Sequence, residues 1–306
     1  MPASTETIHY VCTVRSSRAK AVDLARAEIA ALLRDCDLTL PAGGPLSERP
    51  GVYWVDLAEV HARTMEERAA RLGYTERIEE LAATGPPRRN RPDGPLKWKG
   101  SWYDPLTVWE SDPEEVRLSS PDMRDFALRG EDGRVRTARG YRGDGSSLGP
   151  KALPVPDCRL LVNLVFAPEV RSLLDPFAGA GGIVHEASRN GYSVTSMDIE
   201  PNVAPGLEGL GATHQEGDAG AMPFDSASFD AIATELPYAE ERPGTVRRWT
   251  DEMLRVLRPG ARCAVMCSLA QRDAIAAAAS RERAVVELSE EIDRRGTRVA
   301  VIALRR

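Results

Sequence analysis

The fold of this chain is decided by one stretch: Asp175-Pro176-Phe177-Ala178-Gly179-Ala180-Gly181-Gly182-Ile183. It follows a short apolar run, residues 170–174, which predicts a buried strand, and it leads into a helix that starts near Ile183. Glycine lacks a Cβ, so it permits positive φ and a close approach of the backbone to a ligand. The free N–H groups of the helix start then face that ligand. The stretch therefore predicts a strand, a glycine-rich turn and a helix beside a ligand site.

Two common phosphate-binding motifs are excluded. A dinucleotide-binding turn would read G-x-G-x-x-G, and a phosphate-binding loop would read G-x-x-x-x-G-K-[ST]. Neither pattern fits, because no Lys follows the glycines and Asp175 opens the turn. A carboxylate at this place disfavours a phosphate and suits a cationic ligand, such as a sulfonium with an amino-acid tail.

The Asp-Pro-Phe opening with Gly-x-Gly-Gly-Ile after it resembles motif I of class I S-adenosylmethionine-dependent methyltransferases. Within that class it looks most like the THUMP-associated RNA guanine-N2 methyltransferases. The resemblance implies an α/β, Rossmann-like domain with a seven-stranded, mostly parallel sheet, and S-adenosyl-L-methionine as cofactor. It also implies that the cofactor is held by the residues of the turn: Asp175, Pro176, Phe177, Ala178, Gly179 and Gly181.

Two further acids are candidate cofactor residues. Asp198 ends a strand predicted over 192–197, about 20 residues past the glycine turn, where a carboxylate accepts hydrogen bonds from ribose hydroxyls. Ile199 follows it directly. Farther along, the resemblance implies that Asp218 accepts a hydrogen bond from the adenine amino group, and that Ala219 beside it also contacts the cofactor. The alternatives are a solvent-exposed acid at a strand end and a plain loop acid.

A fourth strand, predicted over 229–234, runs into Glu235-Leu236-Pro237-Tyr238. This resembles motif IV, Asp/Asn-Pro-Pro-Tyr/Phe, of enzymes that methylate exocyclic amines. Acceptors aimed at both N–H bonds of an aryl amine favour a pyramidal nitrogen whose lone pair points at the methyl group. We therefore expect the Glu235 carboxylate and the Leu236 carbonyl to accept hydrogen bonds from the amine. Glu235 is also expected to contact the cofactor. The Tyr238 ring is expected to stack on the ring that carries the amine.

This motif departs from the family pattern at two positions. Glu is one methylene longer than Asp, and Leu replaces the first Pro. These differences leave the identity of the amine open. An ordinary turn at a strand end is the alternative interpretation.

Composition limits the classes of function. The net charge of −6 and the pI of about 5.5 do not favour nucleic acid as a partner. Five scattered cysteines predict neither a disulfide framework nor a zinc site, and indicate a reducing cytoplasm. No metal is expected. No apolar run reaches the roughly 18 residues of a membrane span, so no membrane partner is expected.

Three regions are predicted. Residues 1–83 alternate strand, helix, strand, helix and resemble the small, ferredoxin-like N-terminal α+β unit of the same family. Residues 84–150 are a linker and a curtailed middle region, and residues 151–306 are the methyltransferase domain. Within the linker, Lys97-Trp98-Lys99 and Trp102-Tyr103, with Arg88, Arg89 and Arg91, are either a phosphate-binding and base-stacking patch or a solvated segment. The Gly145–Lys151 segment resembles a family loop that lies across the cofactor.

The sequence thus predicts an S-adenosylmethionine-dependent N-methyltransferase. The resemblance implies an exocyclic nucleobase amine in RNA, as in tRNA guanine N2. The acidic charge and curtailed middle region allow a small-molecule amine or guanidine instead. Because motif IV is altered, a cofactor-binding protein without catalysis is a third hypothesis. The sequence does not predict the oligomeric state.

Overall fold

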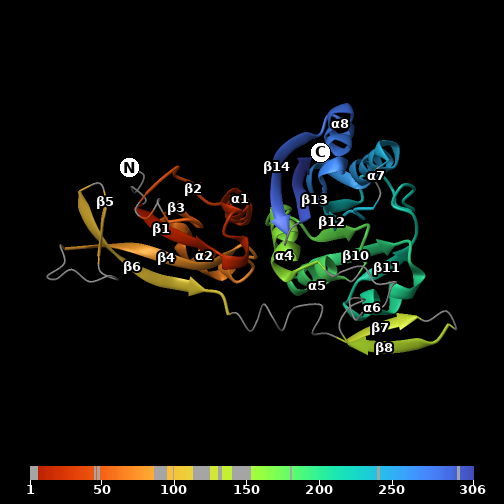
Figure 1. The fold of residues 1–306 in the computed structure, drawn as a ribbon, viewed down its shortest axis with the longest axis horizontal. Helices are drawn as coiled ribbons and strands as arrows, with labels where there is room; N and C mark the ends of the chain where they lie inside the picture. Colours follow the sequence, from red (N-terminus) through yellow and green to blue (C-terminus); the bar gives the residue numbers. More distant parts are fainter. Residues whose placement is uncertain are drawn as a thin grey trace. The chain divides into compact units, whose positions relative to one another are not determined.

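The computed structural model describes two compact units of the chain, Met1–Pro113 and Glu114–Arg306 (Figure 1). The residues described are 6–44, 46, 49–85, 95–98, 100–112, 125–129, 133–139, 153–179, 181–239, 242–294 and 297–306. Among them, no helix combines the length and apolar character needed to cross a bilayer. The Gly145–Lys151 segment and Arg88, Arg89, Arg91 and Lys99 lie outside the described residues.

The first unit is a sheet with two helices. Its elements are β1 (Thr7–Val14), α1 (Val22–Leu32), β2 (Leu38–Thr39), β3 (Val52–Ala58), α2 (Ala62–Ala69), β4 (Thr75–Thr84), β5 (Leu96–Trp98) and β6 (Ser101–Glu110). The strands order as β2-β3-β1-β4-β6-β5. Side chains alternate between the two faces of a strand, so Cys12 and Tyr53 share one face while Val11 and Trp54 share the other. Both faces carry buried hydrophobic residues.

This topology agrees with the ferredoxin-like expectation for residues 1–83. A ferredoxin-like unit contains split βαβ crossovers, in which a helix joins two parallel strands that are separated by a third, antiparallel strand. Here α1 joins β1 to β2 with β3 between them, and α2 joins β3 to β4 with β1 between them, so neighbouring strands pair antiparallel. The order β2-β3-β1-β4 is that of a ferredoxin-like unit, and β6 and β5 extend the sheet beyond β4.

The linker expected to begin at residue 84 is in part a strand hairpin of the first unit. β6 pairs with β4 along its length, from Arg77 opposite Glu110 to Thr84 opposite Trp102. Trp98 lies edge-on to His9 on β1, with 5.3 Å between ring centroids, and Nζ of Lys97 lies 5.8 Å from the Trp102 ring. The Gly- and Pro-rich run before it suggested a loop, but the cross-strand aromatic contacts favour a sheet.

The second unit holds the rest of the elements. They are β7 (Asp125–Arg129), β8 (Val135–Arg139), α4 (Val155–Leu164), β9 (Ser172–Asp175), α5 (Gly182–Arg189), β10 (Ser193–Asp198), α6 (Ala204–Gly209), β11 (Thr213–Glu216), β12 (Phe229–Glu235), α7 (Pro243–Val256), β13 (Leu257–Ser268), α8 (Leu269–Arg281), β14 (Val285–Arg294) and β15 (Thr297–Arg305). β7 and β8 form a separate hairpin, of which β7 lies against α6.

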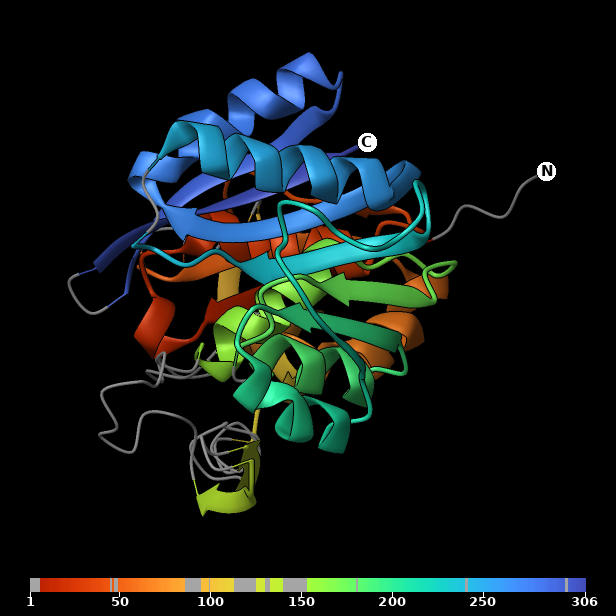
Figure 2. The same cartoon turned by 90° about the vertical axis from the view of Figure 1, so that its right-hand side faces the viewer.

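The other seven strands form one sheet in the order β11-β10-β9-β12-β13-β15-β14 (Figure 2). The first five in this order are parallel, and β15 runs antiparallel between β13 and β14. The order reverses at β9, which pairs with β10 on one side and β12 on the other. This is the doubly wound arrangement that places a ligand crevice beyond the carboxyl ends of the strands. The seven-stranded, mostly parallel sheet expected from the sequence is confirmed.

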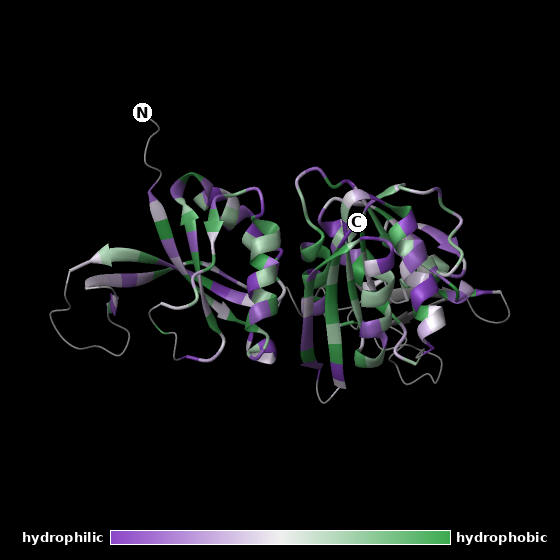
Figure 3. Cartoon of the chain, turned by 90° about the horizontal axis from the view of Figure 1, so that it is seen from above, coloured by the Kyte–Doolittle hydropathy of each residue, from purple (hydrophilic) through white to green (hydrophobic). Residues whose placement is uncertain are grey.

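Helices cover both faces of this sheet. Ile232, Cys263 and Ile302 belong to a buried cluster that includes apolar residues of α7 and α8. α4 and α5 contact each other and the sheet strands from the other face. Hydrophobic residues accordingly follow the strands in Figure 3. Parallel strands buried on both faces need continuous apolar runs, and in β12 Ala231, Ile232, Ala233 and Thr234 are all buried.

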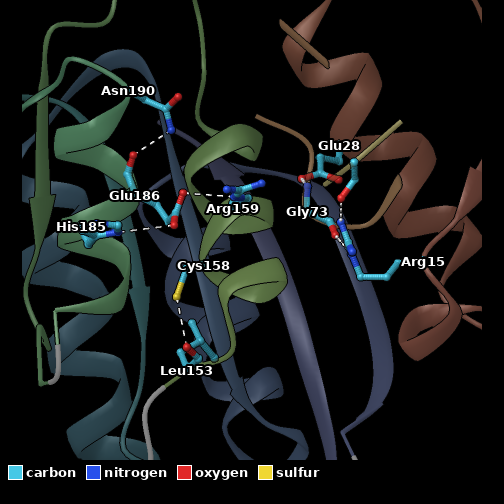
Figure 4. A network of polar contacts seen from close by, with 10 residues as sticks. Arg15, Glu28, Gly73, Leu153, Cys158, Arg159, His185, Glu186 and Asn190 are labelled. Atoms are coloured by element: carbon cyan, nitrogen blue, oxygen red, sulfur yellow. Dashed lines mark hydrogen bonds and ion pairs between the residues drawn. The ribbon is translucent and has the colours of Figure 1, made fainter. Parts of the chain in front are cut away.

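Within each unit, ion pairs and hydrogen bonds of polar side chains connect helices to each other and to loops. Arg159 on α4 pairs with Glu186 on α5 at 3.2 Å (Figure 4). In the first unit, Glu28 on α1 accepts the backbone N–H groups of Gly73 and Tyr74 at 2.8 and 2.9 Å. The two bonds to Glu28 satisfy backbone N–H groups that have no partner within a helix or a strand ladder.

Asp230, near the start of β12, connects this strand to the start of β9 by hydrogen bonds. Its Oδ2 accepts the backbone N–H groups of Arg171 and Ser172, at 3.0 and 2.9 Å, and the Ser172 hydroxyl at 3.0 Å. Arg258 forms an ion pair with the other oxygen. This end of the sheet lies opposite the carboxyl ends where a ligand is expected.

We expect Asp230→Ala to lower the free energy of unfolding by about 1–3 kcal/mol, because it leaves several donors without an acceptor. Urea unfolding followed by circular dichroism measures the loss, and Asp225→Ala, which removes an exposed carboxylate of the same unit, is the control. Equal stability of the two variants would contradict the role of Asp230.

Candidate active site at the carboxyl edge of the second sheet

The glycine turn after β9 has the backbone geometry that its sequence predicts. Gly179 and Gly181 have φ of 44° and 75°, in the left-handed region that favours glycine, and Gly181 is the N-cap of α5. A Cβ at Gly181 would lie 2.6 Å from Cδ1 of Leu210 and 3.0 Å from Cδ2 of Leu207. At Gly181, therefore, contact with the α6 region also requires a glycine, which the sequence did not reveal.

Asp198, at the end of β10, holds this turn in place. Its Oδ2 accepts the N–H of Gly179 at 2.7 Å, and its Oδ1 accepts the N–H of Glu200 at 2.9 Å. The N–H of Ala178 donates to the Met197 carbonyl at 2.9 Å. An ionised carboxylate has about four acceptor positions, so Asp198 keeps capacity for two hydroxyl donors. Asp198 can therefore accept hydrogen bonds from ribose hydroxyls, as predicted, while it also holds the backbone of the turn.

Asp175 lies at the end of β9, with 1% of its surface exposed. Its Oδ1 accepts the hydroxyl of Thr234 at 2.7 Å and the N–H of Phe177 at 3.3 Å. Burial raises the pKa of Asp175 to about 7, although these two hydrogen bonds oppose the rise. The carboxylates of Asp198 and Glu235 add to it. Thr234, which no sequence pattern indicated, is thus a hydrogen-bond partner of Asp175.

The other predicted cofactor residues lie along the same edge. Ile199 is 68% exposed and directly follows Asp198. Asp218 accepts the N–H of Gly220 at 2.7 Å and lies 3.4 Å from Arg248, while Ala219 is buried. Phe177 of the turn packs edge-on against Trp249 on α7, with 4.8 Å between centroids. The contacts of these residues with a cofactor stay predictions.

The motif IV residues form a polar cluster at the end of β12. Tyr238 donates its hydroxyl hydrogen to Oε1 of Glu235. Nη1 of Arg294, at the end of β14, donates to the same carboxylate oxygen at 2.7 Å and to the Tyr238 oxygen at 2.8 Å. Nε of Arg294 also lies 3.2 Å from Oδ2 of Asp157, on α4. Burial raises the pKa of Glu235, while the Arg294 cation and the Tyr238 hydrogen bond oppose the rise.

Leu236 and Pro237 are positioned by the neighbouring elements. The N–H of Leu236 donates to the Met266 carbonyl on β13 at 2.9 Å, and its side chain is buried. The Pro237 carbonyl accepts Nε2 of Gln271 on α8 at 2.9 Å. The assignment of the Leu236 carbonyl as an acceptor for substrate stays a prediction.

This edge fits a cationic methyl donor by the chemistry of its side chains. The carboxylates of Asp157, Asp175, Asp198 and Glu235 lie at the ends of α4, β9, β10 and β12, and Arg294 pairs with two of them. The excess of carboxylates disfavours phosphate and stabilises a cation.

Comparison with known proteins gives the same assignment. Residues 174–265 match the family described as "Methyltransferase domain". The second unit contains a methyltransferase domain, and its sheet has the strand order of the class I, S-adenosylmethionine-dependent fold. The match begins at the end of β9 and covers the glycine turn, Asp198, Asp218 and motif IV.

Relatives resemble this methyltransferase domain over part of their length. The tRNA (guanine(10)-N2)-dimethyltransferase of Pyrococcus abyssi is 39% identical over 98 residues, 29% of this chain and 29% of that protein. An uncharacterized protein of Mycobacterium tuberculosis is 34% identical over 101 residues, 30% of this chain and 35% of that protein. The chain therefore spans about a third of the curated relatives it matches.

A solved methyltransferase structure from Methanosarcina mazei is 17% identical, with a TM-score of 0.40, and the match covers 46% of this chain and 94% of that one.

We predict that Asp198→Ala weakens cofactor binding by about 1–3 kcal/mol, because ribose hydroxyls and the turn amides lose their acceptor. Calorimetry with S-adenosylhomocysteine measures the affinity. Asp198→Asn keeps one carbonyl oxygen and is expected to bind with intermediate affinity, and Asp225→Ala is the surface control. Unchanged affinity in a folded Asp198→Ala variant would rule out this role.

Asp175 predicts a pH dependence of stability. Its folded-state pKa of about 7 exceeds its unfolded value near 4, so the folded protein holds the proton more tightly. The contribution of Asp175 to stability is therefore present below pH 4 and is lost as the pH rises to 7, by about 4 kcal/mol at most.

Asp175→Asn should remove this part of the dependence of the free energy of unfolding on pH. Urea unfolding of wild type and variant between pH 4 and 8 measures the difference. Parallel pH profiles would show that Asp175 does not hold a proton in the folded state.

Proposed function

We propose that this protein transfers a methyl group from S-adenosylmethionine to an exocyclic amine of a nucleobase in RNA, with guanine N2 of tRNA as the first target to test. The observation that carries this proposal is the pairing of Glu235 with Tyr238 at the end of β12, where the sheet order reverses beside the motif I turn. The partial match to an archaeal tRNA guanine-N2 dimethyltransferase supports the same substrate class.

The side chains present suit methylation of an amine. The lone pair of an aryl amine is delocalised into its ring, so the nitrogen is a poor nucleophile until hydrogen-bond acceptors orient its N–H groups. Glu235 is 21% exposed, and its ionised carboxylate can accept one N–H while the Tyr238 ring lies against the base. Bound S-adenosylmethionine supplies an electrophilic methyl group. As the bond between the amine nitrogen and the methyl carbon forms, the carbon–sulfur bond would break and S-adenosylhomocysteine would leave. Glu235 would stabilise the positive charge that develops on the nitrogen, which would then lose its extra proton.

A small-molecule amine or guanidine is the second candidate. It is favoured by the net charge of −6, since RNA binding normally requires a basic surface to replace counterions. An acceptor that carries its own positive charge would also be stabilised by the carboxylates at the site. The two candidates share the same reaction and differ in the acceptor.

We also place the reaction in a reducing compartment, the cytoplasm. The five cysteines are free thiols, and Cys12, Cys158, Cys263 and Cys267 are buried. Free thiols are typical of proteins kept in reducing surroundings.

The test is a mass-spectrometric screen for labelled methyl product, with unmodified tRNA and a cell metabolite extract as competing acceptors. We expect labelled nucleoside after digestion of the tRNA, and an affinity for tRNA that falls as the salt concentration rises. Label in metabolites alone would favour the second candidate. Label in neither fraction would contradict methyl transfer to an amine.

For variants of the acceptor site, we predict separate effects on binding and turnover. Tyr238→Ala removes a stacking surface worth about 1–3 kcal/mol for a base, so it should raise the KM for the acceptor roughly 10- to 100-fold and leave cofactor affinity nearly intact. Tyr238→Phe is the matched control that keeps the ring and removes only the hydroxyl. Glu235→Gln should lower turnover, because it loses a charge that acts on the transition state.

Single-turnover assays distinguish the outcomes. Wild-type rates in both Tyr238→Ala and Glu235→Gln would mean that motif IV does not serve the acceptor. An effect of Glu235→Gln alone would favour an aliphatic amine or guanidine over a nucleobase.

A further inference from the structure

Arg294 connects three elements at the acceptor end of the site. It ends β14, yet its side chain reaches Glu235 and Tyr238 after β12 and Asp157 on α4. Its Nη1 also lies 3.5 Å from the sulfur of Met266 on β13. The side chain is only 16% exposed, so it is part of the site rather than of the surface.

The guanidinium geometry explains why an arginine suits this place. Nε faces the Asp157 carboxylate, while Nη1 lies between the carboxylate of Glu235 and the hydroxyl of Tyr238. A planar group with donors at fixed angles can bind two carboxylates in different directions, whereas a lysine ammonium is a single point charge on a flexible stem. Glu235, which is one methylene longer than the usual motif IV acid, is thereby fixed through Oε1, leaving Oε2 for an incoming N–H.

We propose that Arg294 is a positioning residue of methyl transfer, whose guanidinium holds the Glu235 carboxylate and the Tyr238 ring in the orientation that the acceptor amine requires. This inference rests on the proposed function. Arg294 acts through Glu235 and Tyr238, and it is Glu235 that contacts the amine.

The charges around Glu235 give this role a measurable signature. Arg294 on β14 is the cation that faces it, Tyr238 donates to it, and the carboxylates of Asp157 on α4 and Asp175 on β9 lie close enough to interact with it. The cation favours the ionised form of Glu235 and the carboxylates and burial oppose it. Loss of Arg294 should therefore raise the pKa of Glu235 and move the acidic limb of the pH–rate profile to higher pH.

The experiment compares the full-length variants Arg294→Met and Arg294→Lys, with Arg298→Met as the matched control. Arg298 lies in the same hairpin and pairs with Glu291, away from motif IV. Folding and cofactor affinity are checked first by circular dichroism and by calorimetry with S-adenosylhomocysteine. Single-turnover transfer to the acceptor identified by the screen is then followed between pH 5.5 and 9.

We expect Arg294→Met to bind S-adenosylhomocysteine within about twofold of wild type and to lose at least about tenfold more transfer at low pH than at high pH, which corresponds to one pKa unit. Arg294→Lys should recover part of the low-pH rate, and Arg298→Met should match wild type. Glu235→Gln should lack this acidic limb.

Three results would overturn the assignment. An Arg294→Met profile that coincides with wild type would show that Arg294 does not position Glu235. A uniform loss at every pH, also unrelieved by Arg294→Lys, would show a structural role only. A wild-type protein that methylates no acceptor would overturn the proposed function itself, and this role with it.

Discussion

The structure of the candidate active site depends on the reversal of strand order at β9. Because β9 pairs with β10 on one side and β12 on the other, the segments that follow them separate at the carboxyl edge of the sheet. The turn after β9 then needs acceptors for its own backbone. Asp198 supplies one for Gly179, and the Met197 carbonyl supplies one for Ala178. The acid expected to bind ribose is thus also the group that fixes the turn against which the cofactor would lie.

The second constraint is electrostatic. Four carboxylates, those of Asp157, Asp175, Asp198 and Glu235, come from four different elements to this edge. Burial raises the pKa of Asp175 and of Glu235, so part of the negative charge is held at a cost in free energy. Arg294 compensates two of the carboxylates. A bound sulfonium cation could interact with the remaining carboxylates. The negative charge of the site thus complements the positive charge of the methyl donor.

The sequence predicted the parts of the site that are local. Asp175, Asp198 and Glu235 each end a strand, and a strand followed by an acid or a glycine turn is visible within ten residues. Arg294 could not be found this way, because 59 residues separate it from Glu235 and only the final antiparallel hairpin brings them together. Thr234 was missed because its bond to Asp175 also spans 59 residues.

In the first unit, the Gly- and Pro-rich run before residue 95 suggested a linker, although β5 and β6 extend the sheet. Alternation and turn residues predict where strands begin, but not which strands pair.

The most direct test is a crystal structure of the protein with S-adenosylhomocysteine. We expect the ribose hydroxyls within hydrogen-bond distance of the Asp198 carboxylate, the amino-acid tail at the Asp175–Gly181 turn, and the sulfur directed toward Glu235 and Tyr238. A molecule bound away from the ends of β9 and β10, or a ribose that does not contact Asp198, would contradict it.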